Sequence, residues 1–200
     1  MILVLDSATA ACSAALLGPD GALLDARYEL VGRGHAERLL PMVAELLGGR
    51  VPDSMLVDCG PGSFTGVRVG LAAAHGLAIG WQVPLAGYSS LAAIAAAAGE
   101  PEAAVALTGG HGELFVQSYG GDPLAPLDEL RSRTPDAAAA EVSAALVLGS
   151  GAEALVAARG HGRWRDALPR AADARLLPPD LRSLPPRPIY GRAPDARPMR

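Results

Sequence analysis

The residues of this chain that are best suited to chemistry lie in one run, Gly60-Pro61-Gly62-Ser63-Phe64-Thr65-Gly66-Val67-Arg68. Its glycines and proline predict a tight turn whose backbone can adopt positive φ and approach a ligand closely. The free N–H groups of a turn between a strand and a helix, together with the helix dipole, hold a phosphate or a carboxylate. We therefore interpret the run as a candidate anion or nucleotide loop that consists of Gly60, Gly62, Ser63, Thr65, Gly66 and Arg68.

Two well-known phosphate loops are excluded for this turn. The chain contains no lysine, so the Lys of a P-loop is missing. The glycines are spaced G-x-G-x-x-x-G and do not follow the first strand, unlike those of a dinucleotide-binding fingerprint. Thr65 is placed to cap a helix that starts near Gly66. The alternative is a tight connection that binds nothing.

Other classes of catalysis find little support in the sequence. The missing lysine excludes a Schiff base or a lysine general base. Ser63 and Thr65 do not lie in the G-x-S-x-G elbow of a serine hydrolase, which disfavours a protease. Cys12 and Cys59 show no C-x-x-C spacing and are expected to be reduced, partly buried thiols. No H-x-x-x-H or H-E-x-x-H pair occurs among the four histidines, so we expect no metal: His35, His75, His111 and His161.

The composition describes a folded chain of moderate size. Its 200 residues suffice for one large domain or two lobes, and 50% of them are hydrophobic against 19% charged. The longest apolar stretches are too short to cross a bilayer, and no basic leader opens the chain. We expect a cytoplasmic protein without a membrane partner.

The hydrophobic pattern places the candidate loop in a mixed α/β arrangement. Strands are expected over 2–6, 12–17, 22–30, 55–58 and 83–87, and helices over 35–47, 66–80 and 91–98. Pro41 should kink the first helix or restart it. The second half shows weaker strands over 104–107, 113–119, 124–130 and 146–149, with helices over 137–145 and 152–158. This order is a degenerate echo of the first half and predicts two tandem βββαβα units.

The composition changes at residue 159. Residues 159–200 contain 10 arginines, 8 prolines and four acids and carry +6, whereas residues 1–158 carry −10. We therefore divide the chain into an N-terminal lobe (1–100), a reduced second lobe (101–158) and a Pro/Arg-rich tail (159–200). The tail is expected to be irregular or extended, wrapping the body and attracting an acidic partner or RNA. The alternative is a solvated tail whose composition reflects a GC-rich genome.

Several motifs together resemble the TsaB family of tRNA threonylcarbamoyladenosine biosynthesis proteins. They are Asp6-Ser7-Ala8-Thr9, the run from Gly60 to Arg68, Arg33-Gly34-His35-Ala36-Glu37-Arg38-Leu39-Leu40-Pro41, Gly76-Leu77-Ala78-Ile79-Gly80 and Pro188-Ile189-Tyr190-Gly191-Arg192. The resemblance is dense over 1–100 and thin afterwards. It implies the actin-like, sugar-kinase and Hsp70 ATPase fold, with two βββαβα lobes around a nucleotide cleft and a shortened second lobe.

The resemblance also implies a function. A TsaB protein is the non-catalytic partner of TsaD, and with the ATPase TsaE the pair transfers threonylcarbamoyl to the adenosine beside the anticodon of ANN-decoding tRNAs. Asp6, Ser7 and Thr9 would form the first phosphate loop. This loop lacks the glycine that admits a phosphate, and a family Asp and Arg are replaced in Thr108-Gly109-Gly110-His111. The resemblance thus implies a degenerate cleft, no cofactor of the chain's own, and ATP or ADP only at the complex junction.

A partner surface is expected on the first two helices. Large apolar residues cover more of the first helix than a one-sided helix needs, and small residues line the second. In the family these helices join TsaB to TsaD, or to a second copy when TsaD is absent. The expected interface residues are His35, Leu39, Met42, Val43, Leu46, Gly70, Ala74 and His75.

Three readings therefore remain to be distinguished. The first is the interaction subunit, in which Arg68 holds the turn through backbone carbonyls or pairs an anion at the junction. The second is an autonomous small-molecule kinase or ATPase, which would need a second carboxylate, and Asp58 is the only acid near the turn. The third is a direct tRNA-binding module that uses the basic tail.

Overall fold

The first sheet is built around a strand that is buried on both faces. The computed structural model describes residues 1–191, so Arg192 of the C-terminal motif lies outside the described residues. β1 (Ile2–Asp6) is almost entirely apolar, pairs antiparallel with β2 (Ala11–Leu17) and pairs parallel with β4 (Ser54–Asp58). β3 (Leu23–Leu30) and β5 (Leu85–Tyr88) complete the order β3-β2-β1-β4-β5. Continuous apolar runs fit such central strands, because both faces must be covered.

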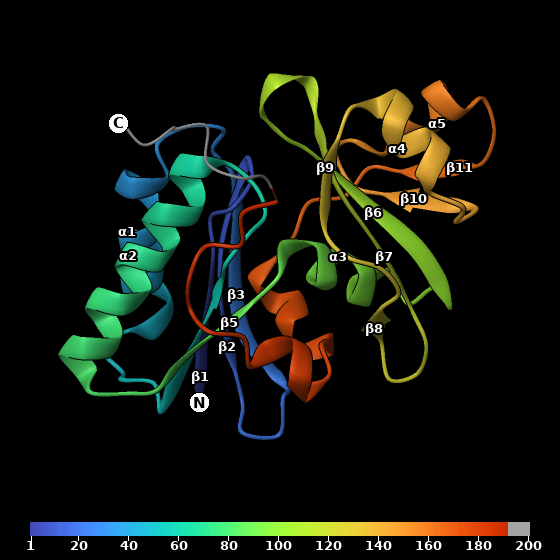
Figure 1. The fold of residues 1–200 in the computed structure, drawn as a ribbon. Helices are drawn as coiled ribbons and strands as arrows, with labels where there is room; N and C mark the ends of the chain where they lie inside the picture. Colours follow the sequence, from blue (N-terminus) through green and yellow to red (C-terminus); the bar gives the residue numbers. More distant parts are fainter. Residues whose placement is uncertain (192–200) are drawn as a thin grey trace, which may run out of the picture.

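Two helices cover the outer face of this sheet (Figure 1). They are α1 (His35–Leu47) and α2 (Phe64–Trp81), and they pack on the sheet through a common core. The helix α1 runs through Pro41 without a break, so the expected restart is absent. Pro41 and Glu37, whose carbonyl loses its helical donor, are both exposed, and water can satisfy that carbonyl.

The second sheet repeats the first. Its strands are β6 (Glu102–Thr108), β7 (Leu114–Gly120), β8 (Ala125–Pro126), β9 (Arg131–Arg133), β10 (Leu146–Leu148) and β11 (Arg163–Arg165). Read from its far edge the order is β8-β7-β6-β10-β11, which is the order of the first sheet. The outer helices α4 (Pro135–Glu141) and α5 (Ala152–Arg159) occupy the sequence positions that correspond to α1 and α2. The duplicated βββαβα arrangement, and with it the predicted actin-like fold class, is confirmed.

One predicted strand of the second lobe is wrong. The pattern favours a single strand over 124–130, but β8 and β9 are two short strands that pair separately with β7. Between them the Asp128 carboxylate accepts the Ser118 N–H at 2.8 Å, so a side chain takes the place of a ladder partner. Pro126 has no N–H to extend β8.

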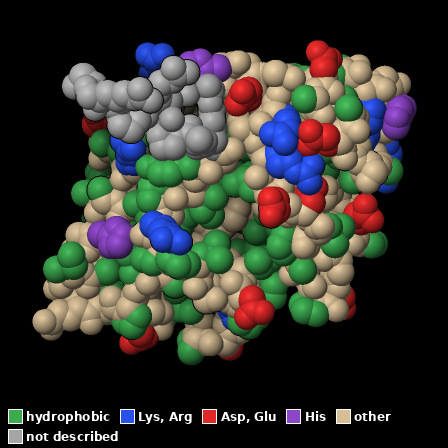
Figure 2. Space-filling view, in the orientation of Figure 1, with side chains coloured by type: hydrophobic (Ala, Val, Ile, Leu, Met, Phe, Trp, Pro, Cys, Tyr) green, Lys and Arg blue, Asp and Glu red, His purple; other side chains and the backbone are tan. Residues whose placement is uncertain are grey.

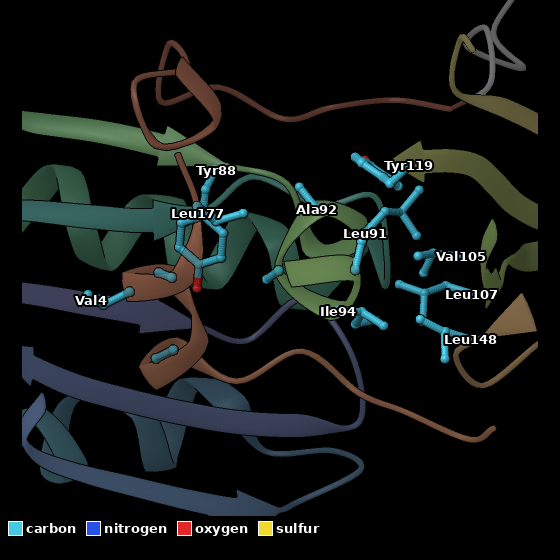
Figure 3. Packing of buried hydrophobic residues seen from close by; sticks show 14 of the residues in the cluster. Val4, Tyr88, Leu91, Ala92, Ile94, Val105, Leu107, Tyr119, Leu148 and Leu177 are labelled. Carbon is cyan, nitrogen blue, oxygen red and sulfur yellow. The ribbon is translucent and has the colours of Figure 1, made fainter. Parts of the chain in front are cut away.

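A middle layer joins the two lobes. α3 (Ser90–Ala98) and the 3₁₀ turn η2 (Ala171–Leu176) lie between the sheets, and their apolar side chains merge with residues from both (Figures 1 and 3). Tyr88, Leu91, Val105, Leu148 and Leu177 are among its buried members. The two lobes therefore share the core of this middle layer, while the outer helices of each lobe pack on a separate core.

The Pro/Arg-rich segment after Arg159 contacts both lobes. β11 is the fifth strand of the second sheet, and Ala171, Ala174 and Leu177 are buried in the middle layer. After the turns η2 and η3 (Pro179–Arg182), Leu184 forms a bridge with Gly87 beside β5. A third 3₁₀ element, η1 (Gly110–Gly112), connects β6 to β7. Within residues 1–191 no helix has both the length and the apolar character that a bilayer span requires.

Candidate functional site: the cleft between the lobes

A cleft of about 850 Å³ opens where the loops of the two lobes face each other. The first lobe contributes the Ala8–Ala10 loop, the start of α2 and Arg68. The second lobe contributes the β6–β7 hairpin, Phe115 and Ser150, and the segment Ile189–Gly191 closes one side. Four of the predicted loop residues thus line this cleft together: Thr9, Gly62, Ser63 and Arg68.

Ser63, and not Thr65, caps α2. Ser63 has non-helical dihedrals, φ −60° and ψ 123°, and its side chain accepts the N–H of Gly66 at 3.3 Å. The helix begins at Phe64, which places Thr65 in its first turn with an exposed side chain. The predicted cap, Thr65, lies two residues after the observed one. Ser and Thr both suit an N-cap position, so residue type alone did not distinguish them, and the helix already includes Phe64 and Thr65 before Gly66.

The glycines of the turn let two backbones touch. A Cβ on Gly62 would lie 2.1 Å from the carbonyl oxygen of Ala8, and one on Gly66 would lie 2.1 Å from that of Ser7. The Ser63 N–H donates to the Ala8 carbonyl at 2.7 Å, and the Ser7 hydroxyl donates to the Gly66 carbonyl at 2.9 Å. The turn thus packs on the loop that follows β1, and part of its donor set is used within the chain.

Below the turn lies a buried pair of acids. Asp6 is 0% exposed and Asp58 is 1% exposed. Burial, and then the neighbouring Asp58 charge, raises the pKa of Asp6 well above its usual range. Burial raises the pKa of Asp58 to about 7, against hydrogen bonds from Gly60 and Ser90 that favour its charged form. Within residues 1–191 no group of three His, Cys, Asp or Glu side chains could hold a metal ion.

Arg68 reaches the C-terminal segment. Its guanidinium lies 3.5 Å from the centre of the Phe64 ring and donates to the Tyr190 hydroxyl at 3.2 Å. These contacts differ from the backbone carbonyls of the turn that the sequence suggested. Arg68 thus links the first turn of α2 to the chain that crosses the mouth of the cleft.

The two candidate histidines have backbone partners. His35 is buried, and its Nε2 lies 2.8 Å from the carbonyl oxygen of Thr9, which ties the first loop to the start of α1. His75 is exposed, and its Nε2 lies 2.9 Å from the carbonyl oxygen of Pro186. His35 therefore acts within the lobe, whereas His75 holds the C-terminal segment on α2.

Six of the expected interface residues point inward. Leu39, Met42, Val43, Leu46, Gly70 and Ala74 are all buried between the helices and the first sheet. The sequence suggested that α1 carries more apolar surface than one buried face needs. In the structure the first sheet and α2 together cover that surface. In their place, exposed apolar side chains occur at Leu40, 47% exposed, Phe64, 61%, and Ile79, 77%. In Figure 2 hydrophobic side chains and few charges cover much of the first-lobe face.

Sequence reasoning missed the role of the residues before Tyr190. The Ile189 N–H donates to the Cys59 carbonyl at 2.8 Å, and the Gly87 and Leu184 backbones exchange two hydrogen bonds. A Cβ on Gly87 would lie 2.3 Å from the Cys59 Sγ, so this close passage requires a glycine. The only sequence signal was the Pro188-Ile189-Tyr190-Gly191 motif, which gives no partner by itself.

Comparisons with known proteins agree with this architecture. The structure superposes on YeaZ from Pseudomonas aeruginosa with a TM-score of 0.78 at 32% sequence identity, covering 88% of this chain and 89% of that one. The tRNA threonylcarbamoyladenosine biosynthesis protein TsaB of Escherichia coli is 40% identical over 127 residues, which are 59% of this chain and 54% of that protein. The family model of TsaD, tRNA N6-adenosine threonylcarbamoyltransferase, matches residues 29–166.

This chain belongs to the TsaB family. The tRNA N6-adenosine threonylcarbamoyltransferase of Corynebacterium diphtheriae is 34% identical over 166 residues, 74% of this chain and 46% of that protein. The chain therefore spans about half the length of the curated relatives that it matches. The resemblance inferred from the TsaB motifs is confirmed.

Proposed function

We propose that this TsaB-family chain is a non-catalytic subunit of a tRNA threonylcarbamoyl transferase complex. The observation that carries the proposal is the direct packing of the Gly-rich turn on the first loop, where Gly62 and Gly66 meet backbone oxygens. A phosphate bound at these loops would need N–H groups of the turn, and the Ser63 and Gly66 N–H groups already donate within the chain. The same observation counts against an autonomous kinase or ATPase, and the relatives named for tRNA threonylcarbamoyladenosine biosynthesis favour the complex.

The proposed partner is TsaD, and the proposed surface is the outer face of α1 and α2. Leu40, Phe64 and Ile79 expose apolar side chains there, and the exposed small residues Ala72, Gly76 and Gly80 allow a partner helix to approach closely. In the absence of TsaD the same face joins two copies of this chain. We propose these exposed residues as the interface in place of the residues that the sequence suggested, which are buried.

The remaining components of the proposal follow from this subunit role. The chain requires no cofactor of its own, and ATP or ADP binds at the junction with TsaD. TsaE joins the assembly, tRNA is bound through the complex, and the reaction takes place in the cytoplasm.

The test is a reconstituted transfer reaction. The host's TsaD, TsaE and adenylate-forming enzyme are mixed with threonine, bicarbonate, ATP and tRNA, and threonylcarbamoyladenosine is measured with this chain present or omitted. We expect product only when the chain is present, and no ATP hydrolysis by the chain alone. Full activity without the chain, or ATP turnover by the purified chain, would contradict the proposal.

A variant pair locates the surface in the same assay. Ile79→Arg places a charge on the exposed face of α2 and should abolish co-elution with TsaD and product formation. Leu127→Arg changes an apolar side chain of the second lobe that is 55% exposed and serves as the matched control. If both variants co-elute with TsaD equally well, the interface does not include the exposed face of α2 around Ile79.

A further inference from the structure

The two buried acids lie at the same end of neighbouring strands. Asp6 ends β1 and Asp58 ends β4, and these strands run parallel with Leu5 opposite Val57. Among residues 1–191 no ion pair includes either carboxyl. Two carboxylates without a cation, removed from water side by side, would repel each other strongly. The fold must therefore reduce their charge in some other way.

The hydrogen bonds to the two acids are unequal. Asp58 accepts the Gly60 N–H at 2.7 Å, and the Ser90 hydroxyl lies 2.8 Å from its Oδ1 and 2.7 Å from its Oδ2. Within residues 1–191, Asp6 accepts the Ala8 N–H, at 3.0 Å on Oδ1, and no donor reaches its buried Oδ2. Asp58 is thus equipped to carry a negative charge, whereas Asp6 has an oxygen that is satisfied only if it becomes a donor itself.

We propose that Asp6 is a neutral carboxylic acid whose Oδ2–H donates to the Asp58 carboxylate, so that the two side chains share one proton and brace the Gly-rich turn as a unit. Asp58 holds the Gly60 N–H and the Ser90 hydroxyl, and the Ser90 N–H donates to the Gly60 carbonyl at 3.0 Å. The shared proton therefore connects β1, β4, the turn that leads into α2 and the first turn of α3. The proposal is independent of the subunit role.

The surroundings of the pair agree with this assignment. Burial is the first cause that raises the pKa of both acids, and the charge of Asp58 raises that of Asp6 further. The other groups that face the pair add no positive charge: Asp173 of η2 raises the pKa of Asp6, and the pKa values of Tyr88, Cys12 and Cys59 are all raised, which keeps these groups neutral.

Infrared spectroscopy of the purified chain tests the proposal directly. At pH 8.5 an ordinary Asp or Glu is ionised, so a C=O stretching band of a protonated carboxyl reports a retained proton. We expect this band in the wild type, its loss in Asp6→Asn, and its persistence in Asp173→Asn, which removes the nearby half-buried acid. Absence of the band in the folded wild type, or its survival in Asp6→Asn, would overturn the assignment.

Thermal unfolding distinguishes the donor from the acceptor. Asp6→Asn keeps a donor group in place of the Oδ2–H and should change Tm by no more than about 3 °C. Asp58→Asn removes the negative charge that holds Gly60 and Ser90 and should lower Tm by about 6 °C or more. A larger loss for Asp6→Asn would place the proton on Asp58 and overturn the proposal. If Asp6→Asn does not fold, Ser90→Ala provides the second test: Asp58 loses a donor, so the Asp6 band should move to lower frequency, and an unmoved band contradicts the proposal.

Discussion

The two lobes place equivalent glycine turns on equivalent strands, but they secure them differently. In the first lobe the β4–α2 turn meets the end of β1 through Gly62 and Gly66, above two fully buried acids. In the second lobe the β10–α5 turn meets the end of β6, where the Gly151 N–H donates to the Ala106 carbonyl at 2.9 Å. Its polar contact, from the Thr108 N–H to the Ser150 hydroxyl at 3.1 Å, is exposed. The second-lobe turn thus also packs on a backbone, because a Cβ on Gly149 would lie 2.3 Å from the Ala106 carbonyl oxygen, but its side-chain contacts are exposed rather than buried.

This difference concerns how the two sides of the cleft are held in place. A buried polar network must be fully satisfied and therefore favours one conformation, whereas exposed hydroxyls exchange with water at little cost. The β6–β7 hairpin, another part of the second-lobe side of the cleft, includes His111 in a left-handed conformation, at φ 59°. The first-lobe side of the cleft is therefore held by buried contacts, whereas the side-chain contacts of the second-lobe turn are exposed.

The largest expected effect comes from adding one methyl group to the first-lobe turn. Gly66→Ala would place a Cβ 2.1 Å from the Ser7 carbonyl oxygen, and neither backbone can yield without breaking the turn. We expect a loss of more than about 4 kcal/mol in the free energy of unfolding, or no folded protein. Denaturant unfolding measures it.

Two further glycine variants complete that comparison. Gly151→Ala meets the flexible end of Leu114 at 2.7 Å and should cost about 1–2 kcal/mol. Gly76→Ala on α2 meets nothing within 4 Å and should add about 0.5–1 kcal/mol of stability through helix propensity. Equal losses for Gly66→Ala and Gly151→Ala would remove the distinction between the two lobes.

The second prediction separates core from surface on α1. Leu39 is 0% exposed, so Leu39→Ala should lower the free energy of unfolding by about 2–5 kcal/mol. Leu40 is 47% exposed, and Leu40→Ala should change it by less than about 0.5 kcal/mol. Only Leu40→Ala should weaken co-elution with TsaD from a folded chain. Comparable unfolding energies for the two variants would show that α1 packs differently from the structure.

The sequence predicts those features of the fold and the site that depend on neighbouring residues, and misses those that depend on residues far apart in the chain. The helix over 35–47 and the strand over 2–6 were predicted with the observed bounds, because their apolar patterns are local. The burial of Leu39 and Met42 was not predicted, because it depends on a sheet and a second helix that lie far away in the sequence. The Asp6–Asp58 pair escaped for the same reason: the parallel pairing of β1 and β4 that brings the two acids together is not a local signal.

The third prediction concerns the change of folding stability with pH. This change has opposite signs for the buried acids of the first lobe and for Glu141 of the second. An unfolded Asp releases its proton near 3.8, whereas folded Asp58 releases it at about 7, which leaves the pair with its one shared proton above that pH; burial raises the pKa of Asp6 well above its usual range. The folded chain binds more protons across this window, so stability falls as pH rises from about 4 to 7, by about 1.4 kcal/mol per pH unit for each retained proton. Glu141 behaves in reverse, because Arg131 and Arg133 lower its pKa and its contribution is lost as pH falls.

Urea unfolding at several pH values measures these signs. The difference between the wild type and Asp58→Asn isolates the contribution of Asp58, and the difference between the wild type and Glu141→Gln isolates that of Glu141. A wild-type stability that changes between pH 5 and 7 by the same amount as that of Asp58→Asn would exclude a proton retained on Asp58 in this range.

The smallest expected effect lies where the C-terminal segment meets α2. Arg68→Ala removes the contact with the Phe64 ring and the hydrogen bond to Tyr190, both near the surface, and should cost about 0.5–1 kcal/mol. Tyr190→Phe removes only the hydroxyl, so it should cost less than Arg68→Ala. Calorimetric Tm values of the two variants provide the measurement. If Tyr190→Phe costs as much as Arg68→Ala, the hydrogen bond carries the whole interaction and Phe64 only happens to lie beside the guanidinium; if neither variant changes Tm, the segment is held by the backbone bonds at Gly87 and Cys59 alone.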